Sequence, residues 1–351
     1  GKTSLAEIML FKAGVTNRIG RVEDGNTVMD YEPEELRRQS SISSAFHQFS
    51  WKKHTVNIID TPGDQNFFND TKFCMPAADC AIFLIDAVDG IKVQTEQAWE
   101  FAREFDMPCV IFINKLDRER ADFTRAFEEA RGILDPKPIV LQLPIGKEAA
   151  LKGVVDLARM KAYSYETDGK AKEIDIPADM KDAVESEREA FIENVAEADD
   201  ALVERYLEGE ELTDEDIKAA LTKGLLSRIF VPVLCGSATA NIGIDLLVDF
   251  IVASVPSPAD RGAINAVDES GENVVTCEPD PSAPFAGFVF KTVADPYAGR
   301  LSIFRIVSGT LGGDGTFYNT NKRTRERYNQ LLTLAGKEQK PAGEAGPGAI
   351  V

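Results

Sequence analysis

Histidine is almost absent from this sequence, which disfavours two kinds of site chemistry. The 351 residues include only two histidines, His47 and His54, so a zinc centre or a histidine-based catalytic site has little to build on. The five cysteines lack metal-ligand spacing; they are Cys74, Cys80, Cys109, Cys235 and Cys277. Several stand in apolar runs, which is typical of small buried side chains in a reducing cytoplasm. We therefore expect a cytoplasmic protein with neither a zinc centre nor a disulfide framework.

Long apolar runs and excess positive charge are missing too. No run approaches the roughly 18 residues of a membrane span. With 39 Lys and Arg against 58 Asp and Glu, the net charge is −19, which disfavours general binding to DNA. Residues 142–230 hold 22 acidic and 12 basic side chains, whereas "NKRTRER" (321–327) clusters four basic ones. Any contact with nucleic acid should therefore be local.

The first residues carry half of a phosphate-binding motif. Gly1-Lys2-Thr3 matches the end of Gly-x-x-x-x-Gly-Lys-[Ser/Thr], whose first half would lie upstream. Apolar residues then recur with helical periodicity from Thr3 to about Lys12. This pattern places the tripeptide at a helix N-terminus, where backbone N–H groups and the helix dipole favour a phosphate. Taken alone, the tripeptide leaves a chance match at a helix start open.

Three further loops follow strand-like apolar runs. Asp60-Thr61-Pro62-Gly63 follows Val56–Ile59, and an Asp at the carboxyl end of a parallel strand can hold Mg²⁺. Asn114-Lys115-Leu116-Asp117 ends the run 108–113. The Asp117 carboxylate can accept from guanine N1–H and the 2-amino group, Lys115 can lie over the ring, and Asn114 can tie the loops together. Gly236-Ser237-Ala238 ends the run 228–235, with backbone N–H groups that can approach guanine O6. Each loop alone could also be an ordinary turn.

The order of these four loops resembles the translational GTPases, and most closely elongation factor G. "NRIGRVEDGNTVMD" (17–30) is similar to the stretch before that family's first switch, and "VPSP" (255–258) to the end of its GTPase domain. Residues 285–311 are similar to the start of its second, β-barrel domain. The resemblance implies GTP or GDP as ligand with Mg²⁺. It implies nucleotide contacts from Gly1, Lys2, Thr3, Asn114, Lys115, Asp117, Gly236, Ser237 and Ala238.

The resemblance also predicts the architecture. We expect an α/β P-loop GTPase domain with a doubly wound, mostly parallel sheet at 1–141 and 229–260, without its first strand and half of the phosphate loop. An inserted acidic α+β subdomain should span 142–228, with strands in "PIVLQLPIG" and a helix at 181–208. Residues 261–282 should be a linker, and 283–351 a β-barrel domain truncated at its C-terminal end, with turns including "DPYAG" (295–299) and "NTNKRTRER".

Two positions depart from the family pattern. The family's first switch reads Arg-Gly-Ile-Thr-Ile, but here Arg38-Gln39-Ser40-Ser41-Ile42 stands there. Ser41 keeps a hydroxyl, so Thr3, Ser41 and Asp60 are the expected metal ligands. The family's His after Asp-Thr-Pro-Gly is replaced by Asp64, so Lys2, Gly63 and Asp64 are the expected catalytic residues. A carboxylate ~4–6 Å from the phosphates would cost on the order of 3–4 kcal/mol at an effective dielectric near 20.

Several functions fit these features. The leading one is a monomeric ribosome-associated GTPase acting in translocation or ribosome recycling. Its partners would be large-subunit rRNA at the factor-binding site and, through the acidic subdomain, the ribosomal stalk. A release-factor or ribosome-protection GTPase shares every motif. Asp64 favours a third alternative, a regulatory GTP-binding paralogue that hydrolyses slowly.

Overall fold

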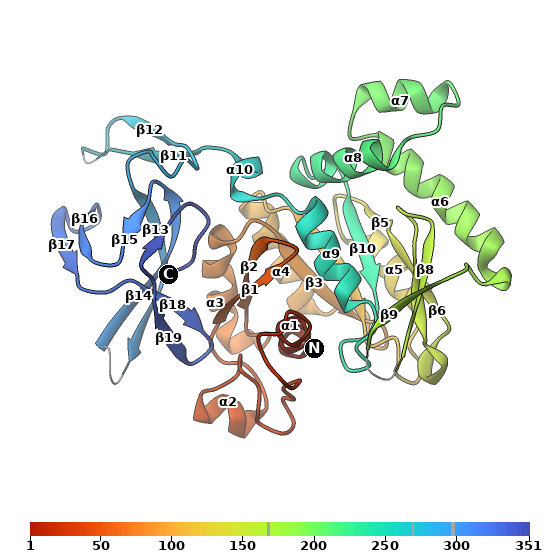
Figure 1. The fold of residues 1–351 in the computed structure, drawn as a ribbon, viewed down its shortest axis with the longest axis horizontal. Coiled ribbons are helices and arrows are strands. Elements are labelled where there is room, and N and C mark those ends of the chain that lie inside the picture. Colours follow the sequence, from red (N-terminus) through yellow and green to blue (C-terminus); the bar gives the residue numbers. More distant parts are fainter. Residues whose placement is uncertain (167–168, 269, 296–298) are drawn as a thin grey trace.

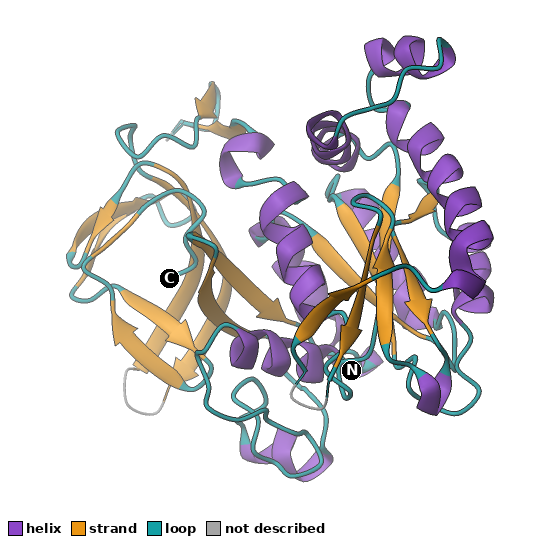
Figure 2. Ribbon diagram, turned by 45° about the vertical axis from the view of Figure 1, so that its right-hand side comes forward, coloured by secondary structure: helices purple, strands orange, loops and turns teal. Residues whose placement is uncertain are grey.

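The computed structural model describes residues 1–166, 169–268, 270–295 and 299–351. Helices and a parallel sheet form one part of the molecule, and antiparallel strands from the last quarter of the chain form the other (Figures 1 and 2). The predicted fold class is confirmed: a P-loop-type parallel sheet with helices is followed by a β domain.

A four-stranded parallel sheet forms the centre of the first part. Its strands run in the order β3-β4-β10-β5. They are β3 (Ala81–Asp86), β4 (Cys109–Asn114), β10 (Val231–Cys235) and β5 (Pro138–Val140). Every residue of β4 and β10 is buried, as the unbroken apolar runs predict for a sheet covered on both faces. β5 corrects one expectation, because Pro138–Val140 pairs with β10 and not with the inserted strands.

The same part of the molecule contains several helices. They are α1 (Lys2–Lys12), α2 (Pro33–Arg38), α3 (Phe68–Cys74), α4 (Val93–Glu104), α5 (Phe123–Ile133) and α9 (Ile244–Ser254). α1 packs against α9, whereas α4 contacts β3 and α5 contacts β4 and β5. Their apolar faces and the sheet share one core.

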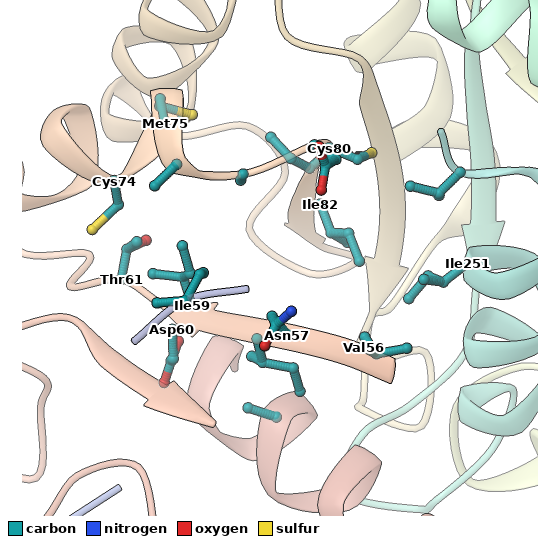
Figure 3. Close-up of a pocket in the computed structure, with 18 of the residues that line it drawn as sticks. Val56, Asn57, Ile59, Asp60, Thr61, Cys74, Met75, Cys80, Ile82 and Ile251 are labelled. Carbon is teal, nitrogen blue, oxygen red and sulfur yellow. Dashed lines mark hydrogen bonds between the residues drawn. The ribbon is translucent and has the colours of Figure 1, made fainter. Parts of the chain in front are cut away.

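An antiparallel hairpin stands beside this sheet without pairing to it. Strands β1 (Ala45–Trp51) and β2 (His54–Asp60) pair in register from Ala45↔Asp60 to Trp51↔His54. A cavity of about 1340 Å³ separates β2 from β3, and every residue of both strands lines it. Figure 3 shows Ile59 of β2, Ile82 of β3 and Ile251 of α9 around this space. The open edge explains why β3 is only partly buried, unlike β4.

The inserted region forms a meander with helices. The sheet order β6-β7-β8-β9 joins β6 (Gln142–Ile145), β7 (Gly153–Asp156), β8 (Lys161–Tyr165) and β9 (Ala171–Ile174). The single helix expected at 181–208 is wrong, because the chain forms α6 (Lys181–Ala196) and α7 (Asp200–Leu207), followed by α8 (Asp214–Leu226). Asp199 interrupts the helix: its carboxylate accepts from the N–H of Ala201, 3.0 Å away, and caps α7.

The last part of the chain is built from antiparallel pairs. After the short helix α10 (Pro258–Arg261), the pairs are β11 (Ile264–Val267) with β12 (Val274–Cys277), β13 (Ala286–Asp295) with β14 (Gly299–Ser308), β15 (Leu311–Gly312) with β20 (Glu344–Ala345), β16 (Gly315–Asn319) with β17 (Thr324–Tyr328), and β18 (Leu332–Ala335) with β19 (Glu338–Pro341). The expected linker 261–282 therefore contains an exposed hairpin. The turn expected at 295–299 lies mostly outside the described residues, and Thr324–Tyr328 is strand, not turn.

The β domain packs against the hairpin and α3. Phe46 of β1 meets Phe290 of β13 edge to face at 5.7 Å between ring centroids. Cys74, Ala77 and Ile303 complete this apolar cluster. The N–H of Gly336 also donates to the Phe46 carbonyl at 2.8 Å. The β domain is thus attached to the segments that flank Asp60, and less to the parallel sheet.

Candidate nucleotide-binding site

The loops after β4 and β10 lie side by side, as the parallel pairing of these strands requires. The side-chain oxygen of Asn114 accepts from two backbone N–H groups, that of Lys115 at 2.8 Å and that of Ala238 at 2.9 Å. Asn114 is almost fully buried, and its two hydrogen bonds hold the two loops together from the protein interior. Gly236 is required at its position, because a Cβ there would lie 2.1 Å from the Ile242 carbonyl oxygen.

Asp117 is held by hydroxyl groups from the second loop. Ser237 donates to its carboxylate at 2.6 Å, and Thr239 donates at 3.3 Å. Ser237 is fully buried, whereas the Asp117 side chain is 24% exposed. Each carboxylate oxygen of Asp117 thus accepts one hydrogen bond from the protein, and the group stays accessible. Thr239 was not among the predicted residues, although it follows Gly236-Ser237-Ala238 directly.

Lys115 is oriented by a carboxylate that the sequence reasoning missed. Its ammonium group lies 2.5 Å from Asp86, which ends β3. Partial burial opposes ionisation of Asp86, but the bonds from the Lys115 ammonium and from the N–H of Val88, 2.9 Å away, outweigh it and lower the pKa of this carboxyl. The signal was present in the sequence: like Asp60, Asp86 is an acidic residue at the end of an apolar strand.

The start of α1 is the expected phosphate end of the site. Gly1 is its N-cap, and the N–H of Leu5 donates back to the Gly1 carbonyl at 3.0 Å. The Lys2 ammonium lies close to Gly63, since a Cβ on Gly63 would be 2.7 Å from Lys2 Nζ. Lys2 and Gly63 thus lie together at the helix N-terminus. Free N–H groups at a helix N-terminus favour an anion at this point.

Two buried carboxylates face the hydroxyl groups of Thr3 and Ser41. The Thr3 and Ser41 hydroxyl oxygens are 3.2 Å apart. Asp60 is 5% exposed and Asp30 only 3%, and one oxygen of each finds no hydrogen-bond partner among the described residues. Burial raises the pKa of Asp60 to about 6, against the opposing effects of Lys2 and Thr3. Burial also raises the pKa of Asp30, against hydrogen bonds from Ser41 and Thr3.

These residues fit a divalent cation that also binds phosphate. Among the described residues no cluster of three or more His, Cys, Asp or Glu side chains could hold a metal alone. Mg²⁺ prefers oxygen ligands and usually takes part of its shell from phosphates and water. Two hydroxyls and two incompletely satisfied carboxylates at a phosphate site match that requirement. Asp30 was missed by the sequence reasoning, because only the fold brings it beside Asp60.

Asp64 occupies an exposed turn. Its carboxylate accepts from the N–H and the side-chain amide of Asn66, at 2.9 and 2.8 Å, and caps the short 3₁₀ helix Gln65–Phe67. Both bonds end on the same oxygen, Oδ1, and they hold the carboxylate in this turn. Whether Asp64 takes part in catalysis stays a prediction.

Both ends of the site open into the cavity beside β2. Gly1, Lys2 and Gly63 line it at one end, and Asn114, Lys115 and Asp86 line it as well. Figure 3 shows Asp60 and Thr61 at the end of β2, where the strand reaches the phosphate side. Six of the predicted residues line this cavity: Gly1, Lys2, Asp60, Gly63, Asn114 and Lys115. Thr3 and Ser41 contact each other beside Asp60, and Asp117 contacts the loop 236–238.

A P-loop GTPase is the class of protein that this fold and these loops define. The family model "Elongation factor Tu GTP binding domain" matches residues 1–257, and "Elongation factor G domain 2" matches residues 284–351. Because the first match covers most of the chain, the chain belongs to the translation-factor GTPase family of the elongation factor Tu and G type. The predicted resemblance is confirmed.

A solved structure has the same fold. The crystal structure of ttk003000868 from Thermus thermophilus matches with a TM-score of 0.88 and 29% identity, covering 100% of this chain and 50% of that one. The chain therefore spans about half the length of that protein. Among the described residues, no helix is long and apolar enough to cross a membrane.

Proposed function

We propose that this chain binds GTP and GDP with Mg²⁺ and hydrolyses GTP on the ribosome. The observation that supports this most is the Asp117 carboxylate, fixed by Ser237 and Thr239 yet accessible beside Lys115. A carboxylate can accept from the N1–H and 2-amino groups of guanine, and adenine offers no matching pair of donors. Asp117 therefore selects guanine over adenine.

Each remaining residue has a role that follows from its place. Lys2 and the N-terminus of α1 neutralise phosphate oxygens, and Thr3, Ser41 and Asp60 hold the cation, with Asp30 beside them. When bound, Mg²⁺ supplies charge neutralisation at the phosphates. Charge stabilisation of this kind provides most of the catalysis in phosphoryl transfer. Gly63 keeps the space beside Lys2 open.

Isothermal titration calorimetry with GTP and ATP tests the guanine assignment directly. We expect measurable binding of GTP and at least hundredfold weaker binding of ATP. Equal affinity for the two nucleotides would overturn the assignment of Asp117 as the base-reading residue.

The geometry of Asp64 supports a second function, slow hydrolysis in a regulatory factor. The carboxylate is already bonded to Asn66, and as an anion it would oppose the phosphates. A single-turnover measurement of GTP hydrolysis with ribosomes in excess separates this candidate from a translocation or recycling factor. Turnover that stays slow favours the regulatory role.

A β-strand from upstream of Gly1 is the proposed occupant of the cavity between β2 and β3. Every residue of both strands lines it, and Leu5, Met9 and Ile251 add apolar walls. A strand that is apolar on both faces suits such a space. Gly1 lines the same cavity, so this strand would lead directly into the phosphate-binding residues. We expect a chain extended by its own upstream residues to bind GDP much more tightly than residues 1–351. Equal dissociation constants would contradict this assignment.

The proposed partner is the ribosome. The basic cluster of the β domain, made of Lys322, Arg323, Arg325 and Arg327, is exposed around β17 and suits phosphate groups of large-subunit rRNA. The acidic inserted region, with helices α6 to α8, is the proposed contact for the stalk. Pelleting with ribosomes, compared between the unmodified protein and a variant with Arg325 and Arg327 changed to Gln, tests the first contact. Co-sedimentation that the double change leaves unaltered would refute a role for this cluster.

A further inference from the structure

One largely buried lysine of the β domain reaches two segments that flank the nucleotide site. The ammonium group of Lys291, on β13, donates to the hydroxyls of Ser43 at 2.5 Å and Ser44 at 2.7 Å. It also contacts the Ser44 carbonyl at 3.2 Å and the carboxylate of Asp70 at 2.8 Å. Asp70 lies on α3, so one side chain joins β13 to the segment after Ser41 and to the helix after Asp64.

The contact is buried and therefore sensitive to loss. The Lys291 side chain is 11% exposed and that of Asp70 22%. The ammonium group of Lys291 also lies 5.7 Å from the centre of the Phe46 ring, and this ring excludes water on that side. Removing one partner of such a pair leaves the other charge buried without compensation, which is far more costly than losing an exposed ion pair.

The first segment is held from its other side as well. The buried carboxylate of Glu35 accepts from the N–H groups of Ile42 at 2.9 Å and Ser43 at 3.2 Å. Residues 42–44 thus lie between a carboxylate of their own region and a lysine of the β domain. Ser41, which faces Thr3, comes directly before them.

The second segment is joined to the Asp60–Asp64 turn by one further bond. Thr71, next to Asp70, donates from its hydroxyl to the Pro62 carbonyl at 3.0 Å. The N–H of Ser44 also donates to the Asp70 carboxylate, at 2.5 Å, so the two segments are connected to each other. A displacement of Lys291 therefore acts on both segments together.

We infer that Lys291 is a positioning residue through which the β domain sets the placement of Ser41 and of the Asp60–Asp64 turn. It touches neither nucleotide nor cation. It fixes the backbone from which the hydroxyl of Ser41 and the side chains of the turn extend. The inference rests on the proposed assignment of Ser41 and the turn to the nucleotide site. Its physical content, the holding of residues 42–44 and 66–72 by Lys291, can be measured separately.

Hydrogen–deuterium exchange of the intact protein tests that content. We expect Lys291→Met to speed amide exchange in residues 42–44 and 66–72 about tenfold, and Lys291→Arg to restore most of the protection. The matched control is Arg305→Met. Arg305 lies at the same domain interface, 8% exposed, and donates to the Ala77 carbonyl and to Asp79, outside both segments. The Arg305→Met variant should therefore show faster amide exchange near residues 77–80 and unchanged amide exchange in residues 42–44.

Two results would overturn the inference. One is an equal rate of amide exchange in residues 42–44 for the Lys291→Met and Arg305→Met variants. That result would mean that Lys291 is a general interface contact with no special effect on these residues. The other is unchanged exchange in a well-folded Lys291→Met variant. If that variant does not fold, Ser43→Ala removes one acceptor without leaving a buried charge, and exchange at residues 42–44 should rise about threefold. Unchanged exchange in Ser43→Ala would then refute the inference.

The dissociation rate of fluorescently labelled GDP distinguishes a positioning role from a merely structural one, because loss of a general interface contact should leave this rate unchanged. We expect Lys291→Met to raise this rate severalfold and Arg305→Met to leave it within twofold of the unmodified protein. The two variants could differ in amide exchange at residues 42–44 and still release GDP at the same rate. That result would show that Lys291 holds the segments without affecting the nucleotide site, and it would refute the role of Lys291 in nucleotide binding. A protein that binds no GDP at all would refute the proposed function while leaving the exchange result intact.

Discussion

Replacing Asp117 by Asn tests the base-reading end of the site with little effect on the fold. The Ser237 hydroxyl, 2.6 Å from the carboxylate, can donate to the amide oxygen of Asn as it donates to Asp. Asp117 is not part of the apolar core, so we expect the free energy of unfolding to change by less than about 1 kcal/mol. The change therefore isolates hydrogen bonding to the base.

The expected loss of affinity is large. Hydrogen bonds to a charged group contribute about 1.5–3 kcal/mol each, and guanine supplies two donors to the carboxylate. Asn keeps one acceptor and turns an amide N–H₂ toward the second donor. A loss of roughly 3–4 kcal/mol corresponds to about 10²- to 10³-fold weaker GDP binding. Xanthine carries a carbonyl at position 2, which the amide can donate to, so XDP should regain much of the lost affinity.

Calorimetric titration of both proteins with GDP and XDP measures this exchange of preference. Glu119→Gln is the matched control, because Glu119 is an exposed acidic residue two positions further along the same loop. It should leave both affinities unchanged. If Asp117→Asn bound GDP as tightly as the unmodified protein, the carboxylate would not face the base and the site would have to be placed elsewhere.

Three further predictions concern other parts of the molecule. Asp64→His should speed single-turnover GTP hydrolysis with ribosomes in excess about tenfold. This gain requires only about 1.4 kcal/mol of electrostatic repulsion between Asp64 and the phosphates to be removed. Fast hydrolysis by the unmodified protein that becomes slower in the Asp64→His variant would show that the Asp64 carboxylate itself promotes hydrolysis. Asp86→Asn should weaken GDP binding two- to fivefold in calorimetry, because the Asp86–Lys115 pair is partly exposed and such pairs contribute about 0–1 kcal/mol; a hundredfold loss would mean that Asp86 touches the nucleotide. Burial raises the pKa of Asp156, so its contribution to stability is present at acid pH and is lost as the pH rises through the folded-state pKa. Denaturant unfolding should therefore show a smaller decline in stability between acid and neutral pH for Asp156→Asn, and an unchanged pH profile would refute this.

Local patterns were sufficient for the elements that carry the site. Apolar runs located β4 and β10, because a strand buried on both faces leaves few polar positions. The run Val56–Ile59 located β2 as well, although that strand lies in an antiparallel hairpin and is only partly buried. The periodicity after Thr3 located α1 to within one residue. The residues chosen at these ends, among them Asn114 and Asp117, are brought together by parallel pairing that the motif order implied.

Long-range contacts could not be read from the sequence. Asp30 and Glu35 lie in a polar stretch, and nothing in their neighbourhood distinguishes a buried carboxylate from a solvated one. Glu35 is buried because four backbone N–H groups surround it, those of residues 31, 32, 42 and 43. The break before α7 was missed for a related reason. A polar residue such as Asp199 does not disturb the spacing of apolar residues along a helix, but its side chain caps a helix N-terminus well.

The division between the hairpin and the parallel sheet has a mechanical consequence. The proposed base-side residues Asn114 and Asp117 lie at the end of β4 of the sheet, whereas Asp60 ends β2 of the hairpin. No strand pairing among the described residues joins β2 to β3. The hairpin is bonded to the β domain instead, through Phe46. The upstream strand proposed for the cavity would lie between β2 and β3 and lead into Gly1, so it would join the two halves next to the phosphate-binding residues. A chain without that strand would hold Asp60 less firmly relative to Asn114 and Asp117.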